Sequence, residues 1–218
     1  MDYRAARKHM VESQVRPNDV TDLRLQTAME TTPRERFLPK ELQNQAYVER
    51  EIEYAPSRWL LRARDFAKLV DIADPRETDL VLNAVCGSGY STAILAQLTE
   101  MVVSIESDEE LAAQAQDNLT SLGFDNAAVI NANPVEGEAD QGPYDLIFIG
   151  GAIEQRPDKL LSQLKDGGRL ATILRENGVS RGVVYRRTGE VFAYSEHFDA
   201  ATSAVLTGFE AEKGFTFS

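Results

Sequence analysis

From residue 79 onward, short apolar runs alternate along the chain with stretches in which apolar residues recur at helical spacing. The apolar runs are nearly continuous, which is typical of parallel strands buried on both faces. They predict strands at 80–85, 101–105, 127–131, 144–150 and 169–174. The other stretches predict helices at 91–98, 108–123 and 157–167, the last ending at Gly167-Gly168. This alternation predicts an α/β fold with a mostly parallel, doubly wound sheet.

The N-terminal part of the chain has a different pattern. Residues 3–31 have helical spacing that is interrupted at Pro17-Asn18-Asp19, which predicts two short helices joined by a turn. The stretch from 32 to 64 is punctuated by prolines, and we expect a long irregular loop there. This loop is expected to lead into a helix at about 63–72.

The C-terminal part differs as well. Apolar residues on both sides of Thr188-Gly189 predict an antiparallel hairpin, and residues 214–218 are expected to supply an edge strand.

With 218 residues, of which 43% are hydrophobic, the chain can bury one substantial core. We therefore expect one compact domain, in which an N-terminal helical and loop segment, 1–78, packs on a Rossmann-like sheet domain, 79–218.

Charge and composition narrow the possible partners. The chain has 35 acidic and 23 basic residues, a net charge of −12. This excess argues against nonspecific binding to nucleic acid or to an anionic membrane. A lone cysteine, Cys86, the absence of a signal-peptide core and the short apolar runs make a cytoplasmic location the expectation. His9 and His197 lack metal-ligand spacing with Cys86, so no metal site is expected.

A glycine-containing turn after the first sheet strand is the leading candidate for a ligand site. Gly87 and Gly89 stand between that strand and its helix, where the backbone can approach a ligand and the helix offers unpaired N–H groups. The second strand ends in Glu106, a carboxylate placed to accept hydrogen bonds from the hydroxyls of an adenosine ribose. Two simpler interpretations are a tight turn at the glycines and a helix-capping role for Glu106.

Several runs of sequence within residues 6–174 carry a family resemblance. They are MVESQVRPNDVTDLRLQTAMETTPRERFLPKELQNQAY, the glycine loop with Tyr90, SIESDEELAAQAQDNLTSLGFDNAAVI, and PYDLIFIGGA through LLSQLKDGGRL. The chain thereby resembles the protein-L-isoaspartate O-methyltransferases. The resemblance implies a class I S-adenosylmethionine-dependent methyltransferase fold and methyl transfer to isoaspartyl carboxylates of protein or peptide substrates, which begins protein repair. It implies cofactor binding at Asn83, Cys86, Gly87, Gly89, Tyr90, Glu106, Ser107 and Asn133.

Three positions near the implied cofactor depart from the family pattern. Asn83 replaces an acidic residue, which removes attraction for the positive charges of S-adenosylmethionine. Val85 replaces a glycine, and a β-branched residue strongly disfavours positive φ, so a loop that needs this conformation must have moved. Asn133 stands where an acidic residue accepts a hydrogen bond from adenine, and its amide oxygen is a weaker acceptor.

The implied acceptor loop also departs from the family. Trp59 and Leu61 stand where the family has threonine and serine, so neither hydroxyl is present. Ser57 and Arg58 are the remaining candidates for acceptor binding, since an arginine can bind a carboxylate bidentately. The simpler interpretation is that Arg58 and its neighbours Arg62 and Arg64 form a solvated surface.

These departures leave competing hypotheses. The first is an isoaspartyl methyltransferase with a changed acceptor site. The second is a noncatalytic protein that has lost cofactor binding and serves as a binding or assembly module, and a third is binding of another adenosine-containing ligand. Cys86 precedes a helix N-terminus, where a reactive thiolate is conceivable, although a small packed residue is the simpler interpretation.

Overall fold

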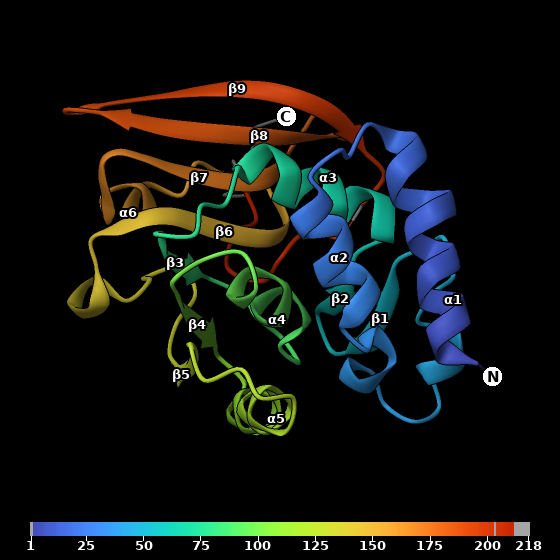
Figure 1. The fold of residues 1–218 in the computed structure, drawn as a ribbon. Coiled ribbons are helices and arrows are strands. Elements are labelled where there is room, and N and C mark those ends of the chain that lie inside the picture. The colour runs from blue at the N-terminus through green and yellow to red at the C-terminus, as the bar shows by residue number, and fades with distance from the viewer. Residues whose placement is uncertain (1, 203, 212–218) are drawn as a thin grey trace, which may run out of the picture.

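The computed structural model describes residues 2–202 and 204–211, and its centre is a seven-stranded sheet of order β5-β4-β3-β6-β7-β8-β9 (Figure 1). The five parallel strands are β3 (Leu80–Asn83), β4 (Met101–Glu106), β5 (Ala127–Asn131), β6 (Tyr144–Ile153) and β7 (Leu164–Glu176). Two antiparallel strands, β8 (Val179–Thr188) and β9 (Val191–Ala200), complete it. The predicted mostly parallel sheet and C-terminal hairpin are confirmed. The edge strand expected at 214–218 lies outside the described residues.

The strand order reverses direction next to β3. The chain moves outward from β3 through β4 to β5 and then returns to β6 on the other side of β3. Ligands of open α/β sheets bind at the carboxyl ends of the strands beside such a reversal. The glycine turn follows β3, and Glu106 is the last residue of β4. Both candidates therefore lie where the topology predicts a site.

Helices cover mainly one face of the sheet. The main ones are α1 (Tyr3–Met10), α2 (Leu23–Thr31), α3 (Ala63–Ala73), α4 (Tyr90–Ala96) and α5 (Glu109–Ser121). Short π or 3-10 turns occur at Val11–Val15, Arg16–Asn18, Arg34–Phe37, Gln43–Gln45 and Ala139–Gln141. The two predicted N-terminal helices are confirmed, and Asp19 at φ +64° ends the turn region between them.

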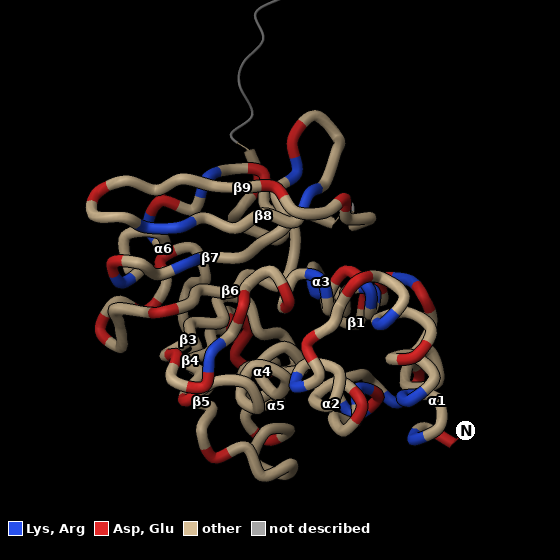
Figure 2. The backbone as a smooth tube through the Cα atoms, turned by 45° about the horizontal axis from the view of Figure 1, so that its top comes forward, with Lys and Arg blue, Asp and Glu red and all other residues tan. Residues whose placement is uncertain are grey.

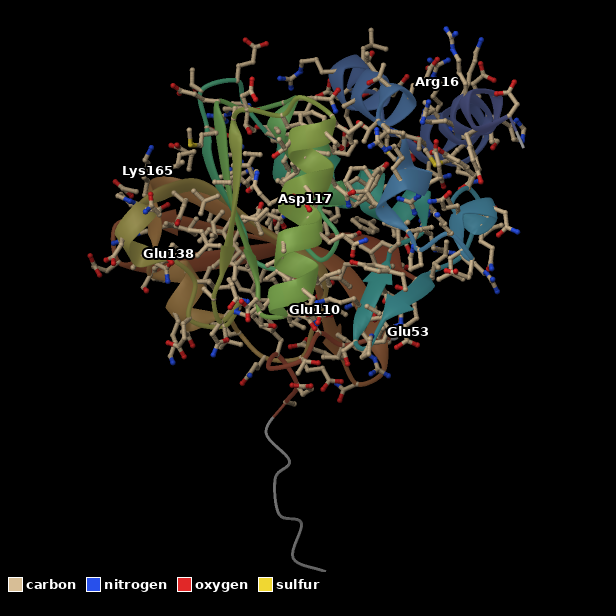
Figure 3. All side chains as sticks on the ribbon, turned by 90° about the horizontal axis from the view of Figure 1, so that it is seen from below. Arg16, Glu53, Glu110, Asp117, Glu138 and Lys165 are labelled. Atoms are coloured by element: carbon tan, nitrogen blue, oxygen red, sulfur yellow. The ribbon has the colours of Figure 1, made fainter. Side chains whose placement is uncertain are left out.

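Neighbouring strand residues face two separate apolar cores, as the strand pleat requires. Val81 faces the core beneath the N-terminal helices, whereas Leu82 faces a second core. That second core is covered by the short helix α6 (Asp158–Leu161) and by coil that reaches Phe209. The acidic and basic residues are interspersed over the molecule (Figure 2), and Glu110 and Asp117 lie on the outer side of α5 (Figure 3). Among the described helices, none has the length and hydropathy to cross a bilayer.

The helix predicted at 157–167 is wrong over most of its length. Only α6 is helical, and the chain enters β7 at Leu164. Gly167, at φ +78°, and Gly168 lie inside β7, where the pairing with β6 is irregular. A Cβ on Gly168 would stand 2.8 Å from a backbone carbonyl oxygen of Lys165. These glycines therefore permit a tight bulge in a strand rather than ending a helix.

The long irregular loop expected at 32–64 is also wrong in part. β1 (Ile52–Ala55) and β2 (Arg58–Leu60) form an antiparallel hairpin that pairs with no strand of the main sheet. Its turn contains Ser57 at φ +58°. An isolated two-stranded hairpin is marginally stable in water, so its side chains must hold it in place. We call residues 52–60 the β1–β2 hairpin.

Arg169 of β7 joins α3 to the sheet from inside the protein. Its side chain is 4% exposed and donates hydrogen bonds to the carbonyl oxygens of Ala73 (2.5 Å), Asp145 (3.1 Å) and Asp74. It also forms an ion pair with Asp79 at 2.6 Å. Removing one partner of a buried pair leaves an uncompensated charge, which is far more costly than breaking a surface pair.

We therefore expect Arg169→Ala to lower the free energy of unfolding by about 3–5 kcal/mol. The matched control is Arg175→Ala on the same strand, whose ion pair with Glu154 is about one third exposed and whose loss costs about 0–1 kcal/mol. Urea titration followed by circular dichroism measures both values. Equal losses in the two variants would contradict the role assigned to Arg169.

Candidate functional site

The glycine turn adopts the conformation for which glycine is needed. Gly87 has φ +55° and Gly89 has φ +97°, and Gly89 is the N-cap of α4. The turn closes through a hydrogen bond from the Gly89 N–H to the Cys86 carbonyl oxygen at 3.0 Å. Val85 does not have positive φ, so its β-branched side chain causes no strain there. The loop thus accommodates Val85 while the two retained glycines form the turn.

Glu106 holds the turn in place from the end of β4. Its side chain is fully buried and accepts hydrogen bonds from the N–H groups of Gly87 and Asp108, each at 3.0 Å. The capping role belongs to Asp108, whose carboxylate accepts from the Leu111 N–H at 2.9 Å as the N-cap of α5. Glu106 is therefore not the helix cap that the simpler interpretation proposed.

Arg58 of β2 supplies two further donors to Glu106, and the Ser107 hydroxyl donates to it at 3.4 Å. The Arg58 Nε donates to one carboxylate oxygen at 2.9 Å, and an Nη donates to the other. The same Nη donates to the Ser107 hydroxyl at 3.0 Å, and the second Nη donates to the Ser57 carbonyl oxygen at 3.0 Å. The hydrogen bonds with Glu106 raise the pKa of the guanidinium. Arg58 thus binds a carboxylate of the protein itself with two hydrogen bonds, and its predicted role with an acceptor carboxylate stays a prediction.

The interpretation of three arginines as a solvated surface is wrong. The Arg58 side chain is 11% exposed, and those of Arg62 and Arg64 are about one quarter exposed. Arg62 and Arg64 both pair with Asp65, a buried residue of α3, at 2.9 Å and 2.6 Å. Buried carboxylates need compensation, and these arginines supply it.

Tyr54 of β1 covers the glycine turn. Its hydroxyl accepts a hydrogen bond from the Ser88 N–H at 3.1 Å, and a Cβ on Gly87 would stand 1.9 Å from that oxygen. Burial raises the pKa of Tyr54 to about 12, so the hydroxyl is neutral near neutral pH. Sequence reasoning missed Tyr54; the apolar residues at Ile52 and Tyr54 before the Pro56-Ser57 turn were the available hairpin signal.

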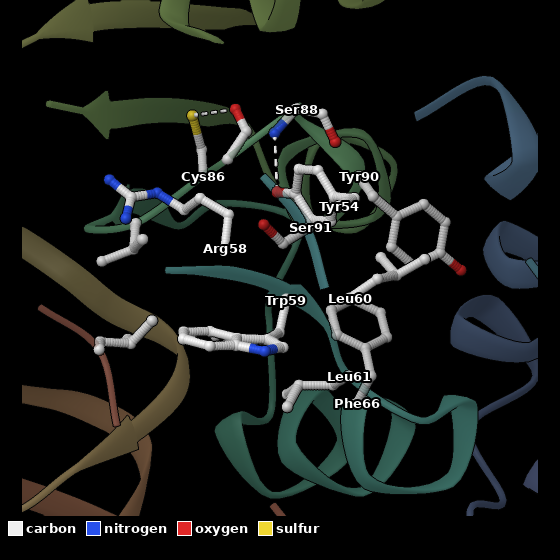
Figure 4. A pocket seen from close by; sticks show the side chains of 14 residues that line it. Tyr54, Arg58, Trp59, Leu60, Leu61, Phe66, Cys86, Ser88, Tyr90 and Ser91 are labelled. Carbon is white, nitrogen blue, oxygen red and sulfur yellow. Dashed lines mark hydrogen bonds between the residues drawn. The ribbon is translucent and has the colours of Figure 1, made fainter. Parts of the chain in front are cut away.

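A small cavity, less open than the cleft described below and called the enclosed cavity for that reason, lies beneath the hairpin (Figure 4). Its volume is about 40 Å³, and its lining includes Trp59, Leu61, Phe66, Cys86 and Tyr90. Ligand pockets usually measure about 300–1,000 Å³. Trp59 thus covers the cavity. Trp59 and Leu61 stand where the family has threonine and serine, so the cavity wall is apolar at these two positions.

Cys86 lies in this lining as a packed residue. It is 4% exposed, and burial raises the pKa of its thiol above the usual range. Its sulfur lies 3.6 Å from the Gly87 carbonyl oxygen. The thiol is therefore protonated at neutral pH, which favours the packed residue over the reactive thiolate.

An open cleft of about 920 Å³ lies on the other side of the hairpin. Ser57, Ser107 and Asn133 line it, and Asn133 is exposed. The Asn133 side-chain oxygen accepts a hydrogen bond from the Val135 N–H at 3.0 Å and retains one lone pair for a ligand. In the described part of the chain, Arg58 alone lines both the cleft and the enclosed cavity. The cleft and the cavity therefore adjoin at Arg58.

Asn83 lines neither the enclosed cavity nor the open cleft. It is fully buried, and its Nδ2 donates to the hydroxyls of Ser91 at 2.8 Å and Thr92 at 3.0 Å. It therefore ties β3 to α4, while its side-chain oxygen has no hydrogen-bond partner among the described residues. The structure thus brings Cys86, Gly87 and Tyr90 together at the cavity and places Ser107 and Asn133 at the cleft.

As they are arranged, these residues do not fit S-adenosylmethionine. The carboxylate that would accept the ribose hydroxyls is already bonded to Arg58, and the side of Gly87 that a ligand would approach is covered by Tyr54. The cavity beside the turn is much smaller than a nucleoside-sized ligand requires, whereas the open cleft lies within the usual range. Binding of the cofactor at the glycine turn and Glu106 would therefore require Tyr54 and Arg58 to leave these groups.

The chain matches known proteins over most of its length. The model of the family "Protein-L-isoaspartate(D-aspartate) O-methyltransferase (PCMT)" matches residues 5–196. The chain is 34% identical over 164 residues to the protein-L-isoaspartate O-methyltransferase of Koribacter versatilis, covering 75% of this chain and 74% of that protein. It is 30% identical over 202 residues to that of Methanospirillum hungatei, covering 93% of each chain.

Two solved structures resemble the fold. One is a protein-L-isoaspartate O-methyltransferase, with a TM-score of 0.80 and 19% identity over 94% of this chain and 66% of that chain. The other, from Plasmodium falciparum in complex with S-adenosyl-L-homocysteine, has a TM-score of 0.74 and 17% identity, covering 92% and 97%. At these identities the likeness concerns the fold, and it agrees with the predicted Rossmann-like class I architecture.

The contact between Tyr54 and the glycine turn makes a testable prediction. Gly87→Ala introduces a left-handed alanine and a clash with the Tyr54 hydroxyl, and it should lower the free energy of unfolding by about 3–5 kcal/mol. Gly123→Ala is the matched control, because Gly123 has φ +79° with open space around it; we expect a loss of about 1–2 kcal/mol. In a Tyr54→Phe background the Gly87→Ala loss should shrink. An unchanged loss, measured by urea titration, would show that Tyr54 does not cover Gly87.

Proposed function

The chain belongs to the protein-L-isoaspartate(D-aspartate) O-methyltransferase family, and on that basis we propose that it methylates the free carboxylate of isoaspartyl residues in damaged proteins, with S-adenosylmethionine as methyl donor. The match over residues 5–196 carries this proposal. It spans the β1–β2 hairpin, the glycine turn and Glu106, so the candidate site lies within the shared region. The substrate is then a protein or peptide.

The cofactor positions are part of the proposal. Gly87, Gly89 and Glu106 support it, since a glycine turn and a carboxylate after the next strand suit an adenosine ribose. Ser107 and Asn133 would face the adenine side, in the open cleft. The remaining proposed positions are Asn83, which acts through α4, together with Cys86 and Tyr90 in the cavity wall.

The proposed carboxylate acceptor requires little acid–base catalysis from the protein. A carboxylate is already ionised near neutral pH, so a general base is not required. Orientation and exclusion of water contribute most to such a transfer. Ser57 and Arg58 remain the proposed acceptor-binding residues, and Arg58 is the cationic side chain in the described lining of the cavity. In the closed arrangement it is committed to Glu106.

The comparisons do not favour the hypothesis of a noncatalytic module. The matched family and the relatives reported above carry the name of a methyltransferase. Another adenosine-containing ligand would use the same turn and carboxylate, but no observation favours it over S-adenosylmethionine. The departures at Trp59 and Leu61 concern the acceptor side, so acceptor identity needs a direct test.

We expect the protein to transfer labelled methyl from S-adenosylmethionine to an isoaspartyl peptide at least about tenfold faster than to the same peptide with ordinary aspartate, a difference of about 1.4 kcal/mol in barrier. Base-labile radioactivity on the peptide measures the transfer. Calorimetric titration with S-adenosylhomocysteine separates the two parts of the proposal. Binding without transfer would refute the isoaspartyl acceptor, and no binding at millimolar ligand would refute the cofactor.

A further inference from the structure

The β1–β2 hairpin uses the protein groups that a nucleoside would need. Arg58 donates two hydrogen bonds to the Glu106 carboxylate, as two ribose hydroxyls would. Tyr54 accepts from the Ser88 N–H, one of the backbone donors at the start of α4. Ligand and hairpin cannot bind these groups at the same time. The two are therefore mutually exclusive at the carboxyl end of β4.

The hairpin is built so that its tip can leave without disturbing the sheet. It pairs with no strand of the seven-stranded sheet, and its base is anchored by the buried side chains of Ile52, Leu60 and Leu61. Its tip, by contrast, carries the exposed Pro56. Polar contacts from Tyr54 and Arg58 hold the tip side against Ser88 and Glu106. The Tyr54 ring also packs against the main core, so opening the tip has to release this apolar contact together with the polar ones, while the base stays in place.

Opening would also change the shape of the site. Arg58 lines both the enclosed cavity of about 40 Å³ and the open cleft of about 920 Å³. Moving its side chain away would join these two spaces at the point where they adjoin. The cleft alone already has the size of a ligand pocket, and joining it to the cavity would extend it to Gly87.

We infer that the β1–β2 hairpin is an autoinhibitory latch, in which the Arg58–Glu106 pair closes the adenosine groove and competes directly with the cofactor. This inference rests on the proposed function for the identity of the ligand. It adds a closed state in which the protein satisfies Glu106 by itself. The apparent affinity for the cofactor is then reduced by the fraction of molecules whose latch is open.

The lone cysteine offers a readout that needs no ligand. Cys86 is the single cysteine of the sequence, is 4% exposed and lines the cavity under the hairpin. Its thiol should therefore react with iodoacetamide only when the latch opens. Because burial raises the pKa of the closed thiol, it stays protonated and slow to react at pH 8.

The test compares Arg58→Ala with Arg62→Ala. Arg62 is another partly buried arginine close by in the sequence, but it lines neither the enclosed cavity nor the open cleft. We expect Arg58→Ala to raise both the Cys86 alkylation rate and the affinity for S-adenosylhomocysteine by about tenfold or more, and Arg62→Ala to change neither. Tyr54→Phe, a milder change, should raise both by less. Thermal melts exclude global unfolding as the cause of faster alkylation.

The outcomes separate the latch from the proposed function. An alkylation rate that stays at the wild-type value in Arg58→Ala and Tyr54→Phe would overturn the latch, whatever the ligand does. Faster alkylation with unchanged affinity, in a wild-type protein that binds S-adenosylhomocysteine, would overturn the competition. If neither wild type nor Arg58→Ala bound this ligand, the proposed function would fail, and the alkylation rates would still decide whether Arg58 holds the hairpin closed.

Discussion

A carboxylate buried at the end of a strand must be surrounded by donors, and Glu106 is where this fold meets that demand. Two backbone N–H groups, from Gly87 and Asp108, supply part of the compensation. The Arg58 guanidinium supplies two more donors together with the opposite charge, and the Ser107 hydroxyl donates as well. An unpaired buried charge costs several kcal/mol, roughly the range of a domain's whole stability margin. The β1–β2 hairpin brings the Arg58 guanidinium to the end of β4.

The same requirement links stability to function. In a cofactor-bound methyltransferase of this fold, ribose hydroxyls would satisfy the carboxylate, whereas here an arginine does so from within the chain. The positive φ of Gly87 and Gly89 keeps the turn in a form that a ligand could approach, yet Tyr54 covers it. The proposed cofactor-binding groups are thus present, but they are engaged by other groups of the protein. Under the proposed latch, activity depends on the balance between internal and external partners for the Glu106 carboxylate.

Much of the fold is readable from the sequence, because its strands are nearly continuous apolar runs. The strand predicted at 127–131 has those bounds in the structure, and the glycine turn and Glu106 lie where the topology requires. The helix predicted at 157–167 failed because the local spacing of apolar residues and their packing in the folded chain disagree. Leu160, Leu161 and Leu164 have helical spacing, but all three are buried in the second core, and a strand begins at Leu164.

The partner of Arg58 could not be predicted in the same way. Its ability to bind a carboxylate follows from its chemistry, but Glu106 is 48 residues away in the sequence. Only the folded chain shows that the candidate ribose acceptor and the candidate acceptor-binding arginine bind each other. Tyr54 was missed because the prolines between 32 and 64 hide a hairpin within an apparently irregular stretch.

The central claim, that Arg58 and the cofactor compete for Glu106, is tested most directly by determining the structure of the protein bound to S-adenosylhomocysteine. We expect the Arg58 guanidinium to lie beyond hydrogen-bonding distance of Glu106, with the ribose hydroxyls bonded to its carboxylate and the enclosed cavity joined to the open cleft. A complex in which Arg58 remains paired with Glu106 while the ligand occupies the groove would contradict the claim.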